Sequence, residues 1–178
     1  FAELGKCSED EVYRAVNIVR PSFIRVEADE GTYNLHVMLR FGIERAMISG
    51  DLSVADLPGA WNESFKQMLG LDVPDHANGC LQDVHWSFGL FGYFPTYTLG
   101  NLYAAQLWQT INGQLPGLED DFAKGDFGRL LAWLNENVHA HGRRYGAGEL
   151  CEKVTGAPLS AEPLLEYLGG KLGPVYGL

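Results

Sequence analysis

The chain has 178 residues, 46% of them hydrophobic and 20% charged, which is ordinary for a globular protein with a sizeable core. It carries 23 acidic side chains against 13 basic ones, so its formal net charge is -10. Sequence-independent binding to nucleic acid or to an anionic membrane needs clustered Lys and Arg, and this balance argues against both partners.

Cysteine usage and hydropathy bear on the cellular compartment. Cys7, Cys80 and Cys151 are odd in number and lack CxxC spacing, so neither a disulfide framework nor a structural zinc knuckle is expected. No run of about 18 apolar residues and no signal-peptide pattern occurs. We therefore predict a cytoplasmic protein. Because the chain starts at Phe1 rather than at a methionine, we expect it to begin inside a longer polypeptide.

Helix signals dominate the first part of the chain. A capping box at residues 8–11 predicts a helix that ends at Pro21, and the β-branched and aromatic residues 23–26 predict an extended segment. A second helix is expected to end near Gly50. Its apolar stripe consists of Leu35, Met38, Leu39, Ile43, Ala46 and Met47.

The helical pattern continues to the end of the sequence. Asp56-Leu57-Pro58 predicts the start of a third helix, which closes before Gly70, and a fourth is predicted over 102–111, ended by Leu115-Pro116-Gly117. No strand alternation persists, so the predicted fold is all-α, a single helical region over residues 1–178. The remaining predicted helices lie at 126–138, 149–154 and 160–168.

Residues 79–100 mix an amide, a carboxylate, an imidazole, an indole and two phenols with glycines and a proline, a composition that neither helix nor strand propensity favours. The glycines permit sharp turns, and Pro95 removes a backbone donor. We expect the polar groups of Gln82, Asp83 and His85 to line a wall or cleft.

Two motifs carry a family resemblance. The run Gly79-x-x-Gln82-Asp83-x-His85-Trp86, with residues 91–97 after it, resembles a signature of the thermostable zinc carboxypeptidases, the carboxypeptidase Taq family. Residues 24–29, Ile-Arg-Val-Glu-Ala-Asp, resemble that family's other downstream signature. The likeness covers nearly the whole chain and implies the C-terminal helical portion of a larger, mainly helical zincin-type metallopeptidase.

The resemblance also implies an activity. Members of the family release single residues from peptide C-termini with broad preference, using a zinc-activated water and a glutamate base. The His-Glu-x-x-His zinc helix has no counterpart in this sequence, so we expect the zinc, or another divalent metal, to be bound upstream of Phe1 and no metal to be bound by this chain. The chain alone is then expected to be inactive.

Arg25 is the predicted anchor for the substrate. A carboxypeptidase must recognise a free terminal carboxylate, and a guanidinium can donate two parallel hydrogen bonds to one. The resemblance implies this role for Arg25. The alternative is a structural salt bridge to Glu27, Asp29 or Glu30.

A tyrosine is the predicted catalytic donor. A neutral phenol can donate to a scissile carbonyl or to a developing oxyanion. The resemblance places a tyrosine of this block near the substrate, and we prefer Tyr97, with Tyr93 in reserve. Buried packing is the alternative for whichever of the two is not functional.

Asp83 and His85 complete the predicted substrate-binding set. Two residues apart, they share a face only on an extended segment, so a direct dyad is conditional. Either can instead support a metal ligand or the anchoring arginine. Capping of a turn by Asp83 and satisfaction of a buried carbonyl by His85 remain equally open. His139 and His141 are interpreted as helix-end histidines rather than as metal ligands.

Two other functions remain as alternatives. One is a non-catalytic helical module that binds a peptide terminus or a partner protein, and the other, ranked well below, is a metal-free hydrolase that uses Asp83 and His85 with Ser87. The expected partner is a peptide with a free C-terminal carboxylate. A homo-oligomer, a dimer, is also expected, because apolar faces cut from a larger helical body would be covered by another copy.

Overall fold

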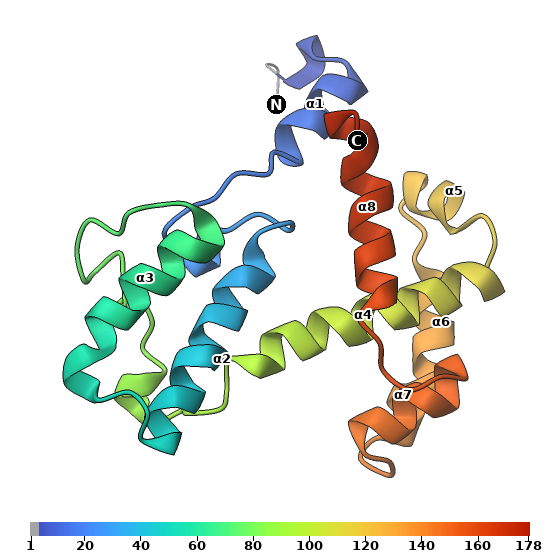
Figure 1. Ribbon diagram of the computed structural model, residues 1–178. Coiled ribbons are helices and arrows are strands. Elements are labelled where there is room, and N and C mark those ends of the chain that lie inside the picture. The colour runs from blue at the N-terminus through green and yellow to red at the C-terminus, as the bar shows by residue number, and fades with distance from the viewer. Residues whose placement is uncertain (1–3) are drawn as a thin grey trace. The chain divides into compact units, whose positions relative to one another are not determined.

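A computed structural model describes residues 4–178, and within this range the fold is all-α, as predicted (Figure 1). The eight α-helices are α1 (Glu9–Val16), α2 (Tyr33–Ser49), α3 (Leu57–Leu69), α4 (Pro95–Gln114), α5 (Leu118–Ala123), α6 (Gly128–Asn137), α7 (Ala147–Thr155) and α8 (Glu162–Tyr176). Short 3-10 turns cover Leu4–Lys6, Arg25–Glu27, Val54–Asp56, Trp86–Phe88 and His139–His141. No helix of the described chain has the length and hydropathy to cross a membrane.

The chain divides into two compact units. The first comprises the residues through Thr98 together with Gly170–Leu178, and the second comprises Leu99–Gly169. The boundaries fall inside α4 and α8, so two continuous helices connect the units.

The capping box forms as predicted at the start of α1. The Ser8 hydroxyl accepts from the Glu11 amide at 3.2 Å, and the Glu11 carboxylate accepts from the Ser8 amide at 2.8 Å. The prediction that the helix reaches Pro21 was wrong. Asn17 ends it, because its side chain donates to the carbonyl of Tyr13 at 2.8 Å and competes with the next helical hydrogen bond.

Glycines end the next two helices as the sequence indicates. Gly50 and Gly70 adopt φ values of 85° and 73°, a left-handed conformation that glycine takes without a Cβ penalty. Asp56 precedes α3 as predicted, but its carboxylate makes no capping hydrogen bond to this helix. The side chain of Ser53 instead accepts from the Asp56 amide at 3.3 Å.

The later helices differ from prediction mainly in length. α4 begins at Pro95 rather than at residue 102, since proline is compatible with the first helical position. α5, with three acidic residues in its first turn, was not predicted, because six residues are too few to show a helical period. α8 continues past residue 168 to Tyr176.

The core of the first unit lies between α2 and α3. Trp61 and Phe65 stack at a centroid distance of 6.4 Å, and Trp86 meets Trp61 edge-on at 6.0 Å. The loop that carries the central motif is thereby packed against α3. The buried members of this core are Leu39, Ile43, Trp61, Phe65, Leu69 and Cys80.

The second unit has its own core, built from α4, α5 and α6 around Ile111, Leu118 and Trp133. The indole of Trp133 donates to the Gln114 side chain at 2.7 Å, which satisfies the one polar group of this buried ring.

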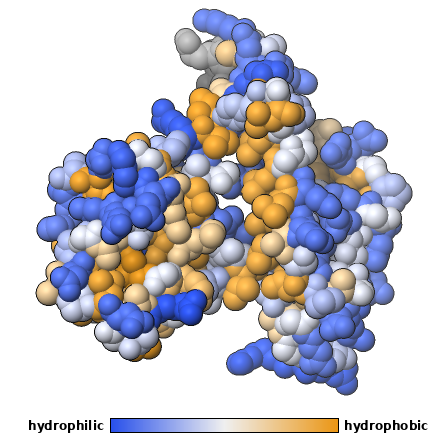
Figure 2. All heavy atoms as spheres, in the orientation of Figure 1, coloured by the Kyte–Doolittle hydropathy of each residue, from blue (hydrophilic) through white to orange (hydrophobic). Residues whose placement is uncertain are grey.

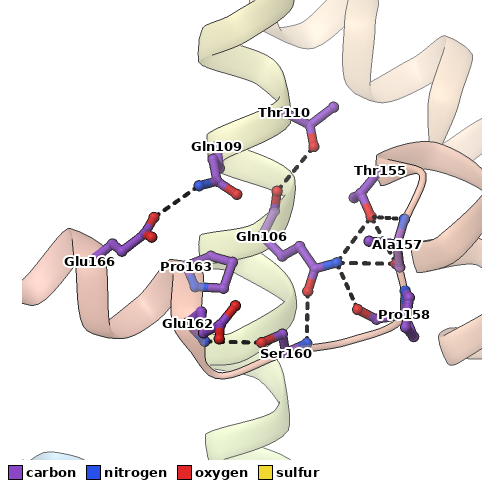
Figure 3. A pocket seen from close by; sticks show the side chains of 10 residues that line it. All are labelled: Gln106, Gln109, Thr110, Thr155, Ala157, Pro158, Ser160, Glu162, Pro163 and Glu166. Carbon is purple, nitrogen blue, oxygen red and sulfur yellow. Dashed lines mark hydrogen bonds between the residues drawn. The ribbon is translucent and has the colours of Figure 1, made fainter.

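A buried amide of α4 bonds the connection between α7 and α8 (Figure 3). Gln106 projects from α4, is buried, and donates through Nε2 to Thr155 Oγ1 and to the carbonyls of Ala157 and Pro158 at 3.0–3.1 Å. Its Oε1 accepts from the Ser160 amide at 2.9 Å. Gln106 therefore bonds the connection from α7 to α8 at four points, and Thr155 and Ser160 add local bonds within it.

Replacing Gln106 by leucine should lower the free energy of unfolding by about 2–3 kcal/mol, because the volume is kept while backbone groups of 157–160 lose their partners. Urea unfolding measures the change. The matched control is Gln109→Leu, one turn along α4, which removes a single exposed bond to Glu166 and should cost less than about 0.5 kcal/mol. Equal losses in the two variants would contradict the role assigned to Gln106.

Candidate functional site

Gln82 joins the two sequence motifs. Its Oε1 accepts from the backbone amide of Arg25 at 3.0 Å, and its Nε2 donates to the carbonyls of Phe23 and Asn78, each at 3.0 Å. The amide group thus bonds its own loop and a segment 57 residues away. This side chain is one of the contacts through which two motifs that are distant in sequence meet.

The prediction of an extended segment over 23–26 was wrong for Arg25. Ile24 is extended, with φ -97° and ψ 119°, but Arg25 begins a 3-10 turn in which the Ala28 amide donates to the Arg25 carbonyl at 3.2 Å. Because Gln82 accepts a hydrogen bond from the Arg25 amide, this backbone N–H needs no partner from a neighbouring strand.

The side chain of Arg25 is 6% exposed and makes an ion pair with Asp83. Its Nη2 and Nε lie 2.8 and 3.2 Å from Asp83 Oδ1, and its Nη1 donates to the Tyr33 hydroxyl at 3.0 Å. A guanidinium has five N–H donors, so two remain without an acceptor among the described residues.

The structural alternative for Arg25 was a salt bridge to a carboxylate close to it in sequence. A salt bridge is present, but its partner Asp83 is 58 residues away. Asp29 instead accepts backbone amides at the turn before α2, and Glu30 pairs with Lys171 at 2.6 Å. Of the roles left open for Asp83, a bond to Arg25 is the one that the geometry displays, whereas substrate binding by Arg25 stays a prediction.

A second arginine, Arg40 of α2, binds the other oxygen of Asp83. Its Nε and Nη2 both lie 2.6 Å from Oδ2, and its Nη1 donates to the His36 carbonyl at 2.7 Å. Arg40 is fully buried, and its guanidinium lies over the ring of Trp61 at 4.6 Å. The sequence prediction did not include Arg40. The sequence did contain an indication, because Arg40 is a charged residue between Leu39 and Ile43, two apolar positions that were predicted to be buried on this helix.

The charges of this cluster stabilise one another. Burial alone would raise the pKa of Asp83, but the hydrogen bonds and charges of Arg25 and Arg40 hold it below its usual value. Burial lowers the pKa of Arg40 to about 10, against the attraction of Asp83. Burial also lowers the pKa of Arg25, but Asp83 outweighs it and leaves that pKa raised. All three groups are charged at neutral pH.

His85 and the two tyrosines lie on the other side of the same cluster. His85 Nε2 is 2.9 Å from the Tyr97 hydroxyl, and the His85 ring is 5.6 Å from that of Tyr93. His85 Nδ1 lies 3.8 Å from Asp83 Oδ1, beyond hydrogen-bond distance, so the conditional dyad is not formed. The alternative in which His85 bonds a buried carbonyl is also not formed, because its ring bonds the phenol of Tyr97.

The predicted site residues therefore lie together. The Arg25 guanidinium carbon is 4.8 Å from the centre of the Tyr97 ring, which joins the ionic half of the cluster to the aromatic half. Tyr93, which is 45% exposed, contacts Tyr97 at 5.5 Å and is the most solvent-accessible member. The cluster consists of Arg25, Asp83, His85, Tyr93 and Tyr97.

Glu44 fixes the loop that leads to Tyr93. Its carboxylate is buried and accepts from Trp86 Nε1 at 2.8 Å and from the Gly92 amide at 3.1 Å. Gly92 has a φ of 78°, so a side chain there would strain the turn. Glu44, four residues after Arg40 on α2, was also absent from the sequence prediction.

The described residues do not fit a metal ion. Among residues 4–178, no group of three His, Cys, Asp or Glu side chains is arranged to hold one. His139 contacts the Asn135 side chain at 2.9 Å, and His141 packs edge-on against Tyr145. Chemistry that requires a metal needs ligands from outside this part of the chain.

Three comparisons with known proteins agree. The model of the carboxypeptidase Taq (M32) metallopeptidases matches residues 2–172. Thermostable carboxypeptidase 1 of Thermus thermophilus is 51% identical over 99% of the chain, and carboxypeptidase 1 of Bacillus subtilis is 45% identical over 95%. The crystal structure of the M32 carboxypeptidase from Deinococcus radiodurans R1 gives a TM-score of 0.95 at 52% identity over 99% of this chain.

The coverage is unequal. The chain spans 35% and 34% of the two curated relatives and 36% of the crystallised protein, about a third of each.

His36 offers a test of the charge distribution around the site. Its ring is fully buried, packs edge-on against Phe65, and has no hydrogen-bond partner among the described residues. Burial, with the charges of Arg40 and Arg25, lowers its pKa from 6.5 to about 4. The unfolded chain then takes up a proton near pH 6.5 that the folded chain does not take up until about pH 4.

The contribution of His36 to the free energy of unfolding is therefore complete above pH 6.5 and is lost as the pH falls towards 4. The loss from this group is about 3 kcal/mol. We expect His36→Leu to remove this part of the pH dependence, measured by urea unfolding at several pH values. The exposed His76 is the control, and His76→Leu should keep the wild-type profile. A His36→Leu profile as steep as that of the wild type would contradict the neutral, buried state of His36.

Proposed function

Because the chain belongs to the carboxypeptidase Taq (M32) metallopeptidase family, we propose that it is the C-terminal, substrate-binding portion of a zinc-dependent metallocarboxypeptidase. The parent enzyme would release single C-terminal amino acids from peptides with broad specificity and act in the cytoplasm. The observation that carries this proposal is the contact between Arg25 and Tyr97 within one cluster.

Arg25 would bind the terminal carboxylate of the peptide. One carboxylate, Asp83, is shared by two guanidinium groups, so positive charge is in excess around it. An incoming carboxylate complements this excess, and the two uncommitted N–H groups of Arg25 suit it. Asp83 would contribute by holding Arg25 in place, because its two oxygens already accept hydrogen bonds from Arg25 and Arg40.

Tyr97 would donate a hydrogen bond from its neutral phenolic hydroxyl to the carbonyl oxygen of the scissile bond as negative charge develops there. His85 lies at hydrogen-bond distance from that hydroxyl and would orient it. Tyr93, half-exposed beside Tyr97, is the second candidate for this contact.

The metal would come from elsewhere in the parent. Zinc, or another divalent ion, would polarise the scissile carbonyl and activate water when bound. We propose that its ligands belong to the part of the relatives that this chain does not cover, since the described residues offer none. The chain alone is then expected to bind substrate without hydrolysing it.

The alternative function is a non-catalytic helical module that binds a peptide terminus or a partner protein. The lack of a metal-binding group within residues 4–178 favours it. A His-Glu-x-x-His segment in the reading frame upstream of Phe1 would decide for the peptidase.

We further propose that the chain forms a homodimer through the outward face of α2. Figure 2 shows apolar side chains reaching the surface over the unit that contains α2 and α3. On α2, Met38, Phe41 and Ile48 are 53%, 43% and 73% exposed, at spacings that place them along one side of the helix. A second copy would cover this face.

Peptide binding tests the role of Arg25. We expect the chain to bind N-benzoyl-glycyl-phenylalanine more tightly than its C-terminal amide, measured by calorimetry. Arg25→Met should raise the dissociation constant of the free acid by about 10- to 100-fold, the loss of hydrogen bonds to a charged group, and leave the amide unaffected.

The control for this experiment is Arg129→Met, which breaks an ion pair with Asp121 in the second unit. It should leave the preference for the free acid unchanged. Equal affinity of the wild type for acid and amide would remove the proposed carboxylate site. Release of phenylalanine by the chain, abolished by a chelator, would contradict its expected inactivity.

The dimer is tested by light scattering after size exclusion. We expect twice the chain mass for the wild type and a monomer for Ile48→Glu, because a buried carboxylate at the interface would lack a partner. Leu131→Glu, at a similarly exposed apolar residue of α6 in the second unit, should stay dimeric. A monomeric wild type would refute the proposal.

A further inference from the structure

Arg40 is a buried cation whose role the proposed function leaves open. It lies in the middle of α2 with none of its side chain exposed, between the rings of Trp61 at 4.6 Å and Phe94 at 5.3 Å. Burying a charge costs free energy, and an apolar side chain of similar volume would often serve a core as well. Packing alone therefore does not account for an arginine at this position.

Asp83, the partner of Arg40, lies outside regular secondary structure. Residues 77–81 form turns, and Asp83 lies between two bends at residues 82 and 84, so no helix or strand sets the orientation of this carboxylate. Arg40 supplies that orientation from a rigid helix, because its Nε and Nη2 converge on Oδ2 at 2.6 Å. With Oδ2 held, the plane of the carboxylate cannot turn, and Oδ1 remains facing Arg25.

Because Arg25 and Arg40 each bind a different oxygen of Asp83, the carboxylate neutralises only part of the charge of Arg25. Each guanidinium now binds one oxygen of Asp83, so Arg25 is only partly neutralised. Without Arg40, the carboxylate would be free to rotate and present both oxygens to Arg25 in a bidentate pair. Arg25 would then shift and attract a second carboxylate less strongly.

We propose that Arg40 is a positioning residue, which holds Asp83 so that Arg25 keeps the orientation and the unshared charge with which it binds a peptide carboxylate. The inference rests on the proposed function for the meaning of that orientation. Arg40 itself, fully buried behind Asp83, does not touch the substrate.

A double-mutant cycle tests whether Arg40 acts through Asp83. The ratio of dissociation constants for N-benzoyl-glycyl-phenylalanine amide and the free acid is measured in the wild type, Arg40→Met, Asp83→Asn and the double variant. Arg40→Met should lower the ratio by about five- to tenfold, and Arg40→Lys, which keeps the charge, should lower it less. In the Asp83→Asn background, Arg40→Met should change the ratio by less than about twofold.

A second measurement needs no peptide and also serves if Asp83→Asn fails to fold. The Nε–H resonance of Arg25 is followed by NMR in the free chain, and Arg40→Met should shift it because Asp83 reorients. Leu69→Ala, which removes buried volume from α3 in the same core, is matched for loss of stability and should leave the resonance in place.

The outcomes separate the two proposals. A wild type without preference for the acid refutes the proposed function, while the Arg25 resonance still decides the role of Arg40. An unshifted resonance in Arg40→Met overturns the inference. So does an Arg40→Met effect on the ratio that is the same with Asp83 and with asparagine at that position.

Discussion

The carboxylate of Asp83, shared between Arg25 and Arg40, is the interaction on which the site depends. It joins a 3-10 turn, a loop and a long helix at distances of 2.6–2.8 Å. Buried charges are tolerated only when paired and hydrogen-bonded, and removing one partner leaves the other uncompensated. The three segments therefore have little freedom relative to one another, and a guanidinium with unused donors is held in place beside an aromatic cluster.

The side chains of Gln82 and Glu44 also fix the backbone around the site through hydrogen bonds. Gln82 bonds the amide of Arg25 to its own loop, and Glu44 bonds the indole of Trp86 and the amide of Gly92. Both side chains satisfy backbone groups that no regular secondary structure could satisfy at these positions. As a result, hydrogen bonds fix the conformation of this glycine-rich loop at several residues.

The two units differ in the polar clusters that they contain. All the residues of the proposed site belong to the first unit, whereas the second has a separate core and its own buried hydrogen-bonding centre at Gln106. The recognition chemistry that we propose therefore lies entirely in the first unit. The chain spans about a third of the relatives' length and has, within its described residues, the proposed site but no metal-binding group.

The sequence alone determined the helical class, the capping box of α1 and the glycine ends of α2 and α3, because these follow from local periodicity and turn chemistry. Its resemblance to a family also named five candidate site residues that the fold brings together, although their roles stay predictions. It did not determine that Arg25 pairs with Asp83 rather than with a neighbouring carboxylate, or that Arg40 and Glu44 take part. Only the tertiary structure decided these partners, since an ion pair forms where chain segments meet in space, and sequence spacing says nothing about a contact across 58 residues.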